Sequence, residues 1–405
     1  MNDNLSILVH EHLHDDVQKL ALQRNRFPQL TDTDFHFLLQ QIEGRQRTKD
    51  KLPYFAQIAN WWYPVRLSCE QCSSEATARY KAQLLSTISY HPSRFIDLTG
   101  GYGVDTYFLS EHVQEAHYVE RNTDLCTIAA HNFSLQRPQI HIHNTTAEEF
   151  LVQHSPSNRE ISDTLLFVDP ARRSQTGSKV FRIEDCEPNI IHLLPTLRKH
   201  ATAILIKFSP MLDIVDALRR LEGKWDVHIV AINNEVKEVL LISAIRSIST
   251  RYQFGKICAI NILPTQNKQY SFYFDIAEEK NAHSILASSM GQYLYEPNAA
   301  IIKAGAFRLI GERFHLAKLD TNTHLYTSDT LIHDFPGRVW EIIDTHLSKT
   351  STLNTKLKYC IISRNYPLTP EQMRKKYKLA DGDDYYLIGA RHLGKPTLML
   401  CLRKF

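Results

Sequence analysis

With 405 residues, of which 43% are hydrophobic and 22% charged, and a formal net charge of +3, the chain is too long for one ordinary hydrophobic core, so two or three globular domains are expected. It has no apolar run near the roughly 20 residues of a membrane-spanning helix and no basic segment before an apolar core at its start, so neither a membrane segment nor a signal peptide is predicted. Seven scattered cysteines favour reduced thiols and a cytoplasmic location.

The first expected domain is a helical N-terminal region at residues 1–88, where apolar residues recur at helical spacing. Its aromatic segment NWWYPV (60–65) could stack on a nucleic-acid base, but packing between domains is the favoured interpretation. Cys69 and Cys72 form a CxxC pair without a second pair or a nearby His, so no zinc or redox site is predicted there. The pattern SCEQ instead predicts a helix capped by Ser68, with both cysteines in its first turn.

Strands and helices alternate in the second expected domain, residues 89–247. Seven strands are predicted, at 94–98, 117–120, 139–144, 164–169, 201–209, 225–233 and 238–244. Helical patterns fill the first five gaps, which predicts right-handed crossovers and a parallel sheet. The last gap, NEVK, is too short for a crossover helix, so the last two strands must be antiparallel. We therefore expect an α/β fold with a seven-stranded Rossmann-like sheet that ends in an antiparallel hairpin, unlike a dehydrogenase sheet.

The third expected domain is an α+β region at residues 248–405. Its segments KLKYCIISRN, TPEQMRKKYKL and DDYYLIGARHLGKPTLMLCLRK predict a strand, a helix and a β-hairpin. Residues 351–405 contain eleven Lys and Arg against four Asp and Glu, a local charge of +7. Such a basic module suggests an anionic partner, nucleic acid first, although a solvated basic surface without a ligand would look the same.

Four polar segments stand at the carboxyl ends of predicted parallel strands, where open α/β sheets bind ligands. They are DLTGGYG (97–103), Glu120, NTTAEEF (144–150) and VDPARR (168–173). Glycines at a strand-to-helix turn let backbone N–H groups approach a ligand, and an acid about 20 residues further on typically holds ribose hydroxyls. The sequence therefore predicts a nucleotide-like cofactor at this edge of the sheet.

The glycine loop does not fit NAD or ATP well. A dinucleotide pattern G-x-G-x-x-G would need its third glycine at Thr106, and no Gly-Lys-Ser/Thr phosphate loop follows. S-adenosylmethionine carries no phosphate, so the loop needs only to clear its methionine part while Asp97 meets polar groups. An NAD-linked oxidoreductase remains as a less favoured alternative.

On these residues the chain resembles the class I S-adenosylmethionine-dependent methyltransferases. DLTGGYG is similar to their first motif, VERN to their acidic second motif, and VDPARR to the D/N-P-P-x motif of those that act on amino groups of nucleobases. The helical start, KFSPMLDI, YEPNAAIIKAGAF and the β-rich tail resemble more closely a bacterial methyltransferase family with a THUMP-like C-terminal domain. The resemblance implies S-adenosylmethionine as cofactor, no metal, and RNA (rRNA or tRNA) as partner, because the THUMP module of relatives binds RNA. It says nothing of the oligomeric state.

The resemblance also implies the residues of the site. The cofactor-binding residues would be Asp97, Thr99, Gly100, Gly101, Gly103, Glu120, Arg121, Thr146, Ala147 and Asp169. The catalytic residues would be Asp169, Pro170, Arg172 and Lys207. Asp169 and the Pro170 carbonyl would accept hydrogen bonds from a target N–H and so aim its nitrogen at the methyl group. The second proline and the aromatic residue of the motif are replaced by Ala171 and Arg172, so an arginine could stack on a base or bind a phosphate instead.

Two features beside this motif stay open. Arg173 could pair with Glu184 or Asp185 instead of binding RNA. The segment SQTGSKVFR (174–182) could cover the target base or be a plain surface loop.

Other acceptor atoms and functions are also open. Lys207 with Asp169 and Glu238 could form part of a Lys–Asp–Lys–Glu set that deprotonates a ribose 2′-hydroxyl, which requires a lysine with a lowered pKa. The first lysine of that set has no clear counterpart in the sequence. Methylation at C5 of a pyrimidine is disfavoured, because neither DPARR nor IKFSP contains a cysteine. A non-catalytic RNA-binding protein that keeps the fold is the alternative outside enzymes.

Overall fold

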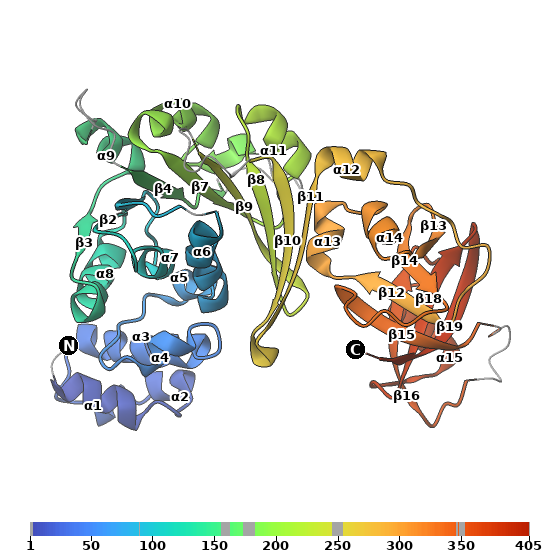
Figure 1. Ribbon diagram of the computed structural model, residues 1–405. Helices are drawn as coiled ribbons and strands as arrows, with labels where there is room; N and C mark the ends of the chain where they lie inside the picture. Colours follow the sequence, from blue (N-terminus) through green and yellow to red (C-terminus); the bar gives the residue numbers. More distant parts are fainter. Residues whose placement is uncertain are drawn as a thin grey trace. The chain divides into compact units, whose positions relative to one another are not determined.

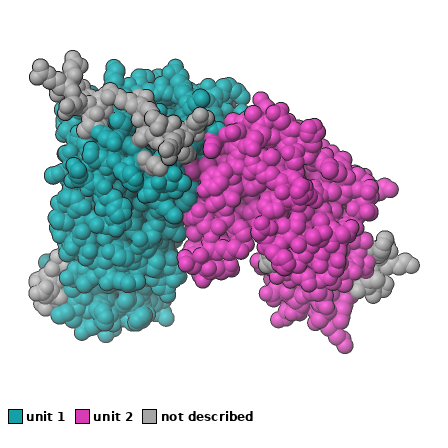
Figure 2. Space-filling view, in the orientation of Figure 1, with its two compact units in different colours: residues 1–227, 237–255 teal, residues 228–236, 256–405 magenta. Residues whose placement is uncertain are grey.

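The structure is a computed structural model that describes residues 3–88, 90–154, 163–172, 183–244, 254–345, 347 and 353–404. Two compact units divide the chain, one of residues 1–227 and 237–255 and the other of residues 228–236 and 256–405 (Figure 2). Among the described residues, no helix is both long enough and apolar enough to cross a membrane.

The N-terminal region is helical, as predicted (Figure 1). Its helices are α1 (Asp3–Glu11), α2 (Val17–Ala21), α3 (Asp32–Thr48), α4 (Pro53–Gln57), α5 (Arg66–Gln71) and α6 (Glu75–Thr87), with a 3-10 turn at Arg24–Arg26. The apolar faces of α1, α2 and α3 form one core around Phe35, Leu38 and Ile42. The side chain of Thr31 accepts a hydrogen bond from the Asp34 N–H and so caps the start of α3.

The aromatic segment packs inside the first unit, which confirms the packing interpretation. Trp61 is buried and stacks on Phe55, with ring centroids 4.3 Å apart, and its indole N–H donates to the Tyr102 hydroxyl at 2.9 Å. Trp62 stacks on His131 at 3.7 Å. The N-terminal helices therefore contact the glycine loop, to which Tyr102 belongs.

The predicted capping box around the CxxC pair is wrong. Helix α5 follows Val65, which makes no side-chain capping bond, so Ser68 lies inside the helix instead of before it. Cys69 is buried in α5 and Cys72 is the residue that ends it. The helix therefore begins three residues earlier than the polar pattern indicated, at Arg66.

All seven predicted strands of the second expected domain are present. They are β1 (Arg94–Asp97), β2 (Glu115–Val119), β3 (Ile140–His143), β4 (Thr164–Val168), β7 (Ala203–Phe208), β8 (Asp226–Ile232) and β9 (Glu235–Ala244). The crossover helices are α7 (Val104–Leu109), α8 (Thr123–Gln136), α9 (Ala147–Gln153), α10 (Ile190–His200) and α11 (Ile214–Arg220). Strands β1, β2, β3, β4 and β7 pair in parallel, whereas β9 is antiparallel to β7, as expected. Short strands β5 (Ala171–Arg172) and β6 (Cys186–Glu187) pair separately, beside a 3-10 turn at Ile183–Asp185.

The sheet has nine strands instead of the expected seven. Its order is β11-β10-β8-β9-β7-β4-β1-β2-β3, so β10 (Lys256–Leu263) and β11 (Lys268–Asp275) extend it beyond β8. These two strands follow residue 247, where the sequence pattern ended the sheet. The edge of β8 offers unpaired N–H and C=O groups, and an adjacent hairpin satisfies them.

The rest of the second unit contains an eight-stranded sheet of order β13-β14-β12-β15-β19-β18-β16-β17. Its strands are β12 (Tyr293–Pro297), β13 (Ala317–Asp320), β14 (Thr323–Ser328), β15 (Gly337–Asp344), β16 (Lys358–Arg364), β17 (Ala380–Asp381), β18 (Tyr385–His392) and β19 (Lys395–Arg403). The helices are α12 (Ile276–Asn281), α13 (Ala299–Ala304), α14 (Leu309–Arg313) and α15 (Pro370–Tyr377), with a 3-10 turn at Pro264–Gln266. The predicted strand, helix and hairpin correspond to β16, α15 and β18–β19, and the capping box of α15 is present at Thr369 and Gln372.

Candidate functional site

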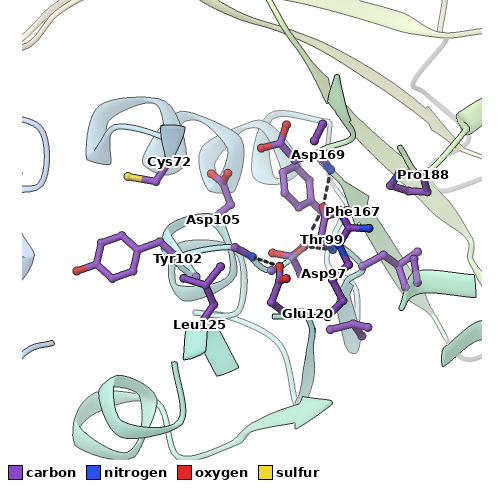
Figure 3. Close-up of a pocket in the computed structure, with 18 of the residues that line it drawn as sticks. Cys72, Asp97, Thr99, Tyr102, Asp105, Glu120, Leu125, Phe167, Asp169 and Pro188 are labelled. Carbon is purple, nitrogen blue, oxygen red and sulfur yellow. Dashed lines mark hydrogen bonds between the residues drawn. The ribbon is translucent and has the colours of Figure 1, made fainter. Parts of the chain in front are cut away.

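A cavity of about 320 Å³ lies at the carboxyl ends of β1, β2, β4 and β7 (Figure 3). It brings together most of the site residues predicted from the sequence. Those that line it are Asp97, Thr99, Gly100, Gly101, Gly103, Glu120, Arg121, Thr146, Ala147, Asp169 and Lys207. Parallel strands end at one edge of their sheet, which is why segments far apart in the sequence meet here.

The glycine loop between β1 and α7 approaches its neighbours too closely for side chains. An added Cβ on Gly100 would lie 2.2 Å from the ring of Tyr118. Gly103 has φ +85° and precedes α7, and its Cβ would lie 2.7 Å from the ring of Phe133. The N–H of Gly101 donates to Glu120 at 2.9 Å. The glycines therefore let the backbone of the loop pack directly on these rings at the wall of the cavity.

Asp97, at the end of β1, is buried with 1% of its surface exposed. One carboxylate oxygen accepts the N–H of Thr99 at 2.9 Å, and the other accepts the hydroxyl of Thr106 at 2.6 Å. Burial raises the pKa of this carboxyl to about 7, although both hydrogen bonds oppose the rise. Thr106, which stands where a dinucleotide loop has glycine, instead fixes the orientation of Asp97.

Two further predicted segments complete the wall of the cavity. Glu120 accepts from the Asn122 N–H at 2.8 Å as well as from Gly101, so its carboxylate is oriented by backbone groups on both sides. Arg121 forms an ion pair with Glu187 at 2.7 Å. Thr146 caps α9 in a capping box with Glu149, which explains why the helix begins at the cavity.

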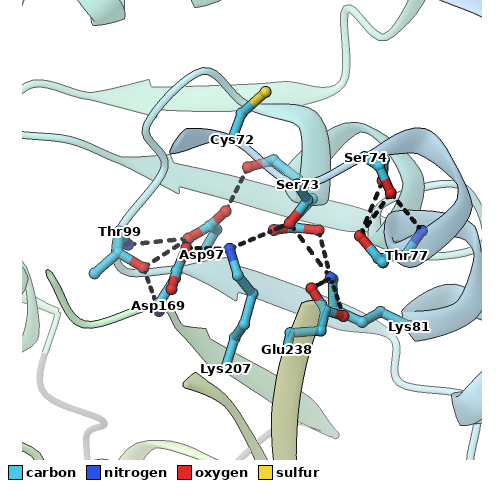
Figure 4. A network of polar contacts seen from close by, with 12 residues as sticks. Cys72, Ser73, Ser74, Thr77, Lys81, Asp97, Thr99, Asp169, Lys207 and Glu238 are labelled. Atoms are coloured by element: carbon cyan, nitrogen blue, oxygen red, sulfur yellow. Dashed lines mark hydrogen bonds and ion pairs between the residues drawn. The ribbon is translucent and has the colours of Figure 1, made fainter. Parts of the chain in front are cut away.

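A network of charged side chains, most of them buried, lies at the wall of the cavity (Figure 4). Lys207 of β7 binds the Asp169 carboxylate and lies 3.7 Å from Asp105. Lys81 of α6 has no exposed surface, contacts both oxygens of Glu238 at 2.7 and 2.8 Å, and lies 3.1 Å from Asp105. Asp105 therefore joins the two lysines into one network of five charged side chains.

The charges in this network set the protonation of its members. Burial disfavours the charged form of Lys207, but the carboxylates of Asp169 and Asp105 outweigh it and raise the pKa of its ammonium group. Burial likewise acts against ionised Asp105, but the neighbouring lysines lower the pKa of its carboxyl overall. The raised pKa keeps Lys207 protonated, whereas a lysine that deprotonates a hydroxyl needs a lowered pKa.

Lys81 and Asp105 were missed in the sequence, although each left a signal. Asp105 follows the glycine loop directly, in GYGVD. Lys81 shares the buried face of α6 with Ala78 and Leu85. A lysine at an apolar position of a helix pattern indicates a buried carboxylate partner, because an unpaired buried charge is strongly destabilising. Lys81 supplies the lysine that the Lys–Asp–Lys–Glu interpretation lacked. Ser73, whose hydroxyl donates to Asp105 at 2.6 Å, also lines the cavity.

Other predicted residues lie apart from the cavity or outside the described residues. Pro170 is buried and is not among the described residues that line the cavity. The side chain of Arg172, Arg173 and the segment 174–182 are outside the described part of the chain. Glu184, one expected partner of Arg173, forms an ion pair with Arg220.

Among the described residues, no group of three or more His, Cys, Asp or Glu side chains is arranged to hold a metal ion.

Comparisons with known proteins cover both units. Family models for a ferredoxin-like domain and a THUMP-like domain match residues 293–336 and 337–403. The crystal structure of a Porphyromonas gingivalis W83 protein, assigned to the methyltransferases, is 31% identical with a TM-score of 0.85, over 99% of this chain and 98% of that one. Proteins of two Mycobacterium tuberculosis strains, both named as uncharacterised S-adenosylmethionine-dependent methyltransferases, are 21% identical over 357 residues, 85% of this chain and 89% of theirs.

Proposed function

Because this chain belongs to the class I S-adenosylmethionine-dependent methyltransferases with a THUMP-like C-terminal domain, we propose that it methylates RNA at a nitrogen of a base. S-adenosylmethionine is its cofactor, which removes the support for an NAD-linked oxidoreductase.

The cavity at the glycine loop is the proposed cofactor site. When bound, S-adenosylmethionine supplies an electrophilic methyl group on a positively charged sulfur. The three carboxylates and two lysines of the adjoining network carry a net charge of −1 when all are ionised, which suits a cationic ligand. We assign the methionine part to the glycine loop and Asp97, the ribose hydroxyls to Glu120, and the adenine to the segment at Thr146 and Ala147.

RNA is supported as the substrate by the C-terminal region. Residues 337–403 match the THUMP-like model, and residues 351–405 have the local charge of +7. A basic surface attracts the phosphates of nucleic acids irrespective of their sequence. All seven cysteines are free thiols, in keeping with the expected cytoplasmic location.

The observation that carries the base-nitrogen assignment is the way Asp169 is held. Lys207 binds one of its carboxylate oxygens and the Thr99 hydroxyl accepts its backbone N–H at 2.6 Å, while 37% of the side chain stays exposed. A carboxylate fixed in this way can accept a hydrogen bond from a target N–H and orient the nitrogen, and orientation supplies much of the rate of such a transfer. The lone pair of an amino nitrogen forms the new N–C bond as the S–C bond breaks and S-adenosylhomocysteine leaves. The methylated nitrogen then loses its extra proton to Asp169 or to water, so no lysine base is needed.

The ribose 2′-hydroxyl is a second candidate because Lys81 completes the set of Lys81, Asp169, Lys207 and Glu238. A hydroxyl must lose its proton to attack, and Lys207 would have to be neutral to take it. The raised pKa of Lys207 favours the base nitrogen over this route.

The test is methyl transfer by the purified full-length protein. Total RNA from a strain that lacks the gene would be incubated with S-adenosylmethionine carrying a labelled methyl group, digested to nucleosides and analysed by mass spectrometry. We expect one nucleoside with the label on its base. A label on the ribose would replace the first candidate by the second, and unlabelled RNA with a protein that binds the cofactor would refute RNA as the substrate.

A further inference from the structure

The second unit contains a separate cavity of about 690 Å³, built from both of its family-matched segments. Glu296 at the end of β12 and Lys303 of α13 line it from the ferredoxin-like segment. Arg338 at the start of β15 and Arg364 at the end of β16 line it from the THUMP-like segment. The volume lies in the range of about 300–1,000 Å³ that is common for small-ligand sites.

One buried carboxylate holds both arginines of this cavity. Glu296 is 5% exposed, and one of its oxygens accepts the Nε–H of Arg364 at 2.5 Å while the other accepts from Arg338. The two guanidinium groups carry ten N–H donors, more than one carboxylate can accept. The side chains of Arg338 and Arg364 remain 31% and 44% exposed. The arrangement orients two cations at the cavity wall and neutralises only one of their two charges.

The remaining lining is polar or neutral. His324 stacks on Phe307 with ring centroids 3.7 Å apart, and burial together with Lys318 lowers its pKa to about 4, so the ring is uncharged near neutral pH. Asn365 donates to Thr323 at 3.2 Å. With Glu296 shared by two arginines and Lys303 also present, the four charged side chains sum to +2.

Planar guanidinium groups bind the oxygens of phosphate in pairs, and amide and imidazole groups pair with the edges of nucleobases. We propose that this cavity binds one nucleotide of a single-stranded segment of the RNA substrate, with its phosphate on Arg338 and Arg364. The inference rests on the proposed RNA substrate. It separates the atoms that hold the RNA from those that methylate it, because every residue named here belongs to the second unit.

The test measures binding of a short single-stranded RNA, labelled at its 3′ end, to full-length protein by fluorescence anisotropy over a range of salt concentrations. Arg364→Gln removes one charge-assisted contact to a phosphate and should weaken RNA binding about tenfold. It should also reduce the slope of log affinity against log salt concentration by about one. Arg338→Gln should behave in the same way. Lys280→Gln removes an exposed charge from α12, outside both the cavity and the basic residues 351–405, and should change the affinity less than twofold.

Thermal unfolding of each variant checks that the unit stays folded. Arg364→Lys is a milder variant, which keeps the positive charge but cannot bind a phosphate through two parallel N–H groups. Equal RNA affinity of Arg364→Gln and Lys280→Gln would overturn the inference. Binding of adenosine monophosphate without competition by RNA would overturn it in favour of a free nucleotide. RNA binding that depends on both arginines, but without methyl transfer to RNA, would support the cavity and refute the proposed function.

Discussion

Lys81 and Glu238 stand 157 positions apart in the sequence, yet the Lys81 ammonium lies 2.7 and 2.8 Å from the two carboxylate oxygens of Glu238 in the interior of the first unit. The pair joins a helix that precedes β1 to the last strand of the predicted sheet. Through Asp105 it also contacts the lysine that holds Asp169. The N-terminal helices are therefore connected to Asp169 at the cavity by charged groups as well as by apolar packing.

Removing Lys81 should destabilise the protein strongly. Lys81→Met leaves Glu238 buried without its main partner, and breaking a buried ion pair costs about 3–5 kcal/mol. The double variant Lys81→Met/Glu238→Leu should recover much of that loss, because neither charge is then buried alone. The measurement is the free energy of unfolding in urea, with Lys375→Met as an exposed control. A loss below about 1 kcal/mol would mean that solvent reaches this pair.

Alanine at Gly103 should impair cofactor binding. The residue has φ +85°, and its new Cβ would meet the ring of Phe133 at 2.7 Å, so the glycine loop must shift. A shift that costs about 1.4 kcal/mol of binding free energy weakens the binding of S-adenosylmethionine tenfold, which calorimetric titration can measure.

Gly394→Ala is the matched control for that loop variant. Gly394 also has a positive φ, +78°, but nothing lies within 4 Å of its added Cβ, and it belongs to the β18–β19 hairpin of the second unit. It should lose about 1–2 kcal/mol of stability and keep its cofactor affinity. Equal cofactor affinity of both variants would argue against the glycine loop as part of the cofactor site.

Asp97 should make the stability depend on pH. Its pKa is about 7 in the folded protein against an ordinary 3.8, so the folded state binds more protons than the unfolded state between these values. The free energy of unfolding therefore falls as pH rises from about 4 to 7, by up to about 4 kcal/mol from this group. Asp97→Asn removes the effect, so its stability relative to the natural protein should increase over the same range. Thermal unfolding at several pH values tests this, and parallel curves would contradict it.

Two substitutions of Lys207 should distinguish the acceptor atoms. If Lys207 acts as a cation that positions Asp169, Lys207→Arg should keep methyl-transfer activity within about tenfold, whereas Lys207→Gln should lose much more. If Lys207 takes the proton of a ribose hydroxyl, arginine cannot replace it, because a guanidinium group stays protonated, and the activity of both variants should fall by about 10²–10⁴-fold. The rate is measured at saturating cofactor, with cofactor affinity determined separately for each variant.

Several elements could be predicted because their signals are local. The seven predicted strands, β1 to β4 and β7 to β9, are largely apolar runs, the first six of them separated by helical patterns, and the gap after β8 leaves room only for a tight turn. The glycine loop and Glu120 each follow directly after a predicted parallel strand. Because parallel strands end at a common edge of the sheet, the sequence alone indicates that the two meet there. The predicted start of α5 was wrong because the local signal is absent there: Val65, which precedes the helix, has no polar side chain to cap it.

The sequence by itself determined the order of strands and crossover helices, the antiparallel end of the predicted sheet and the edge at which the site lies. Only the tertiary structure decided that Lys81 completes the charged network, that the Lys207 pKa is raised, and that β10 and β11 extend the sheet. Periodicity and turn residues depend on near neighbours in the chain and can be read from it. The energy of a buried charge depends instead on which distant carboxylates share its interior, and packing alone brings those together.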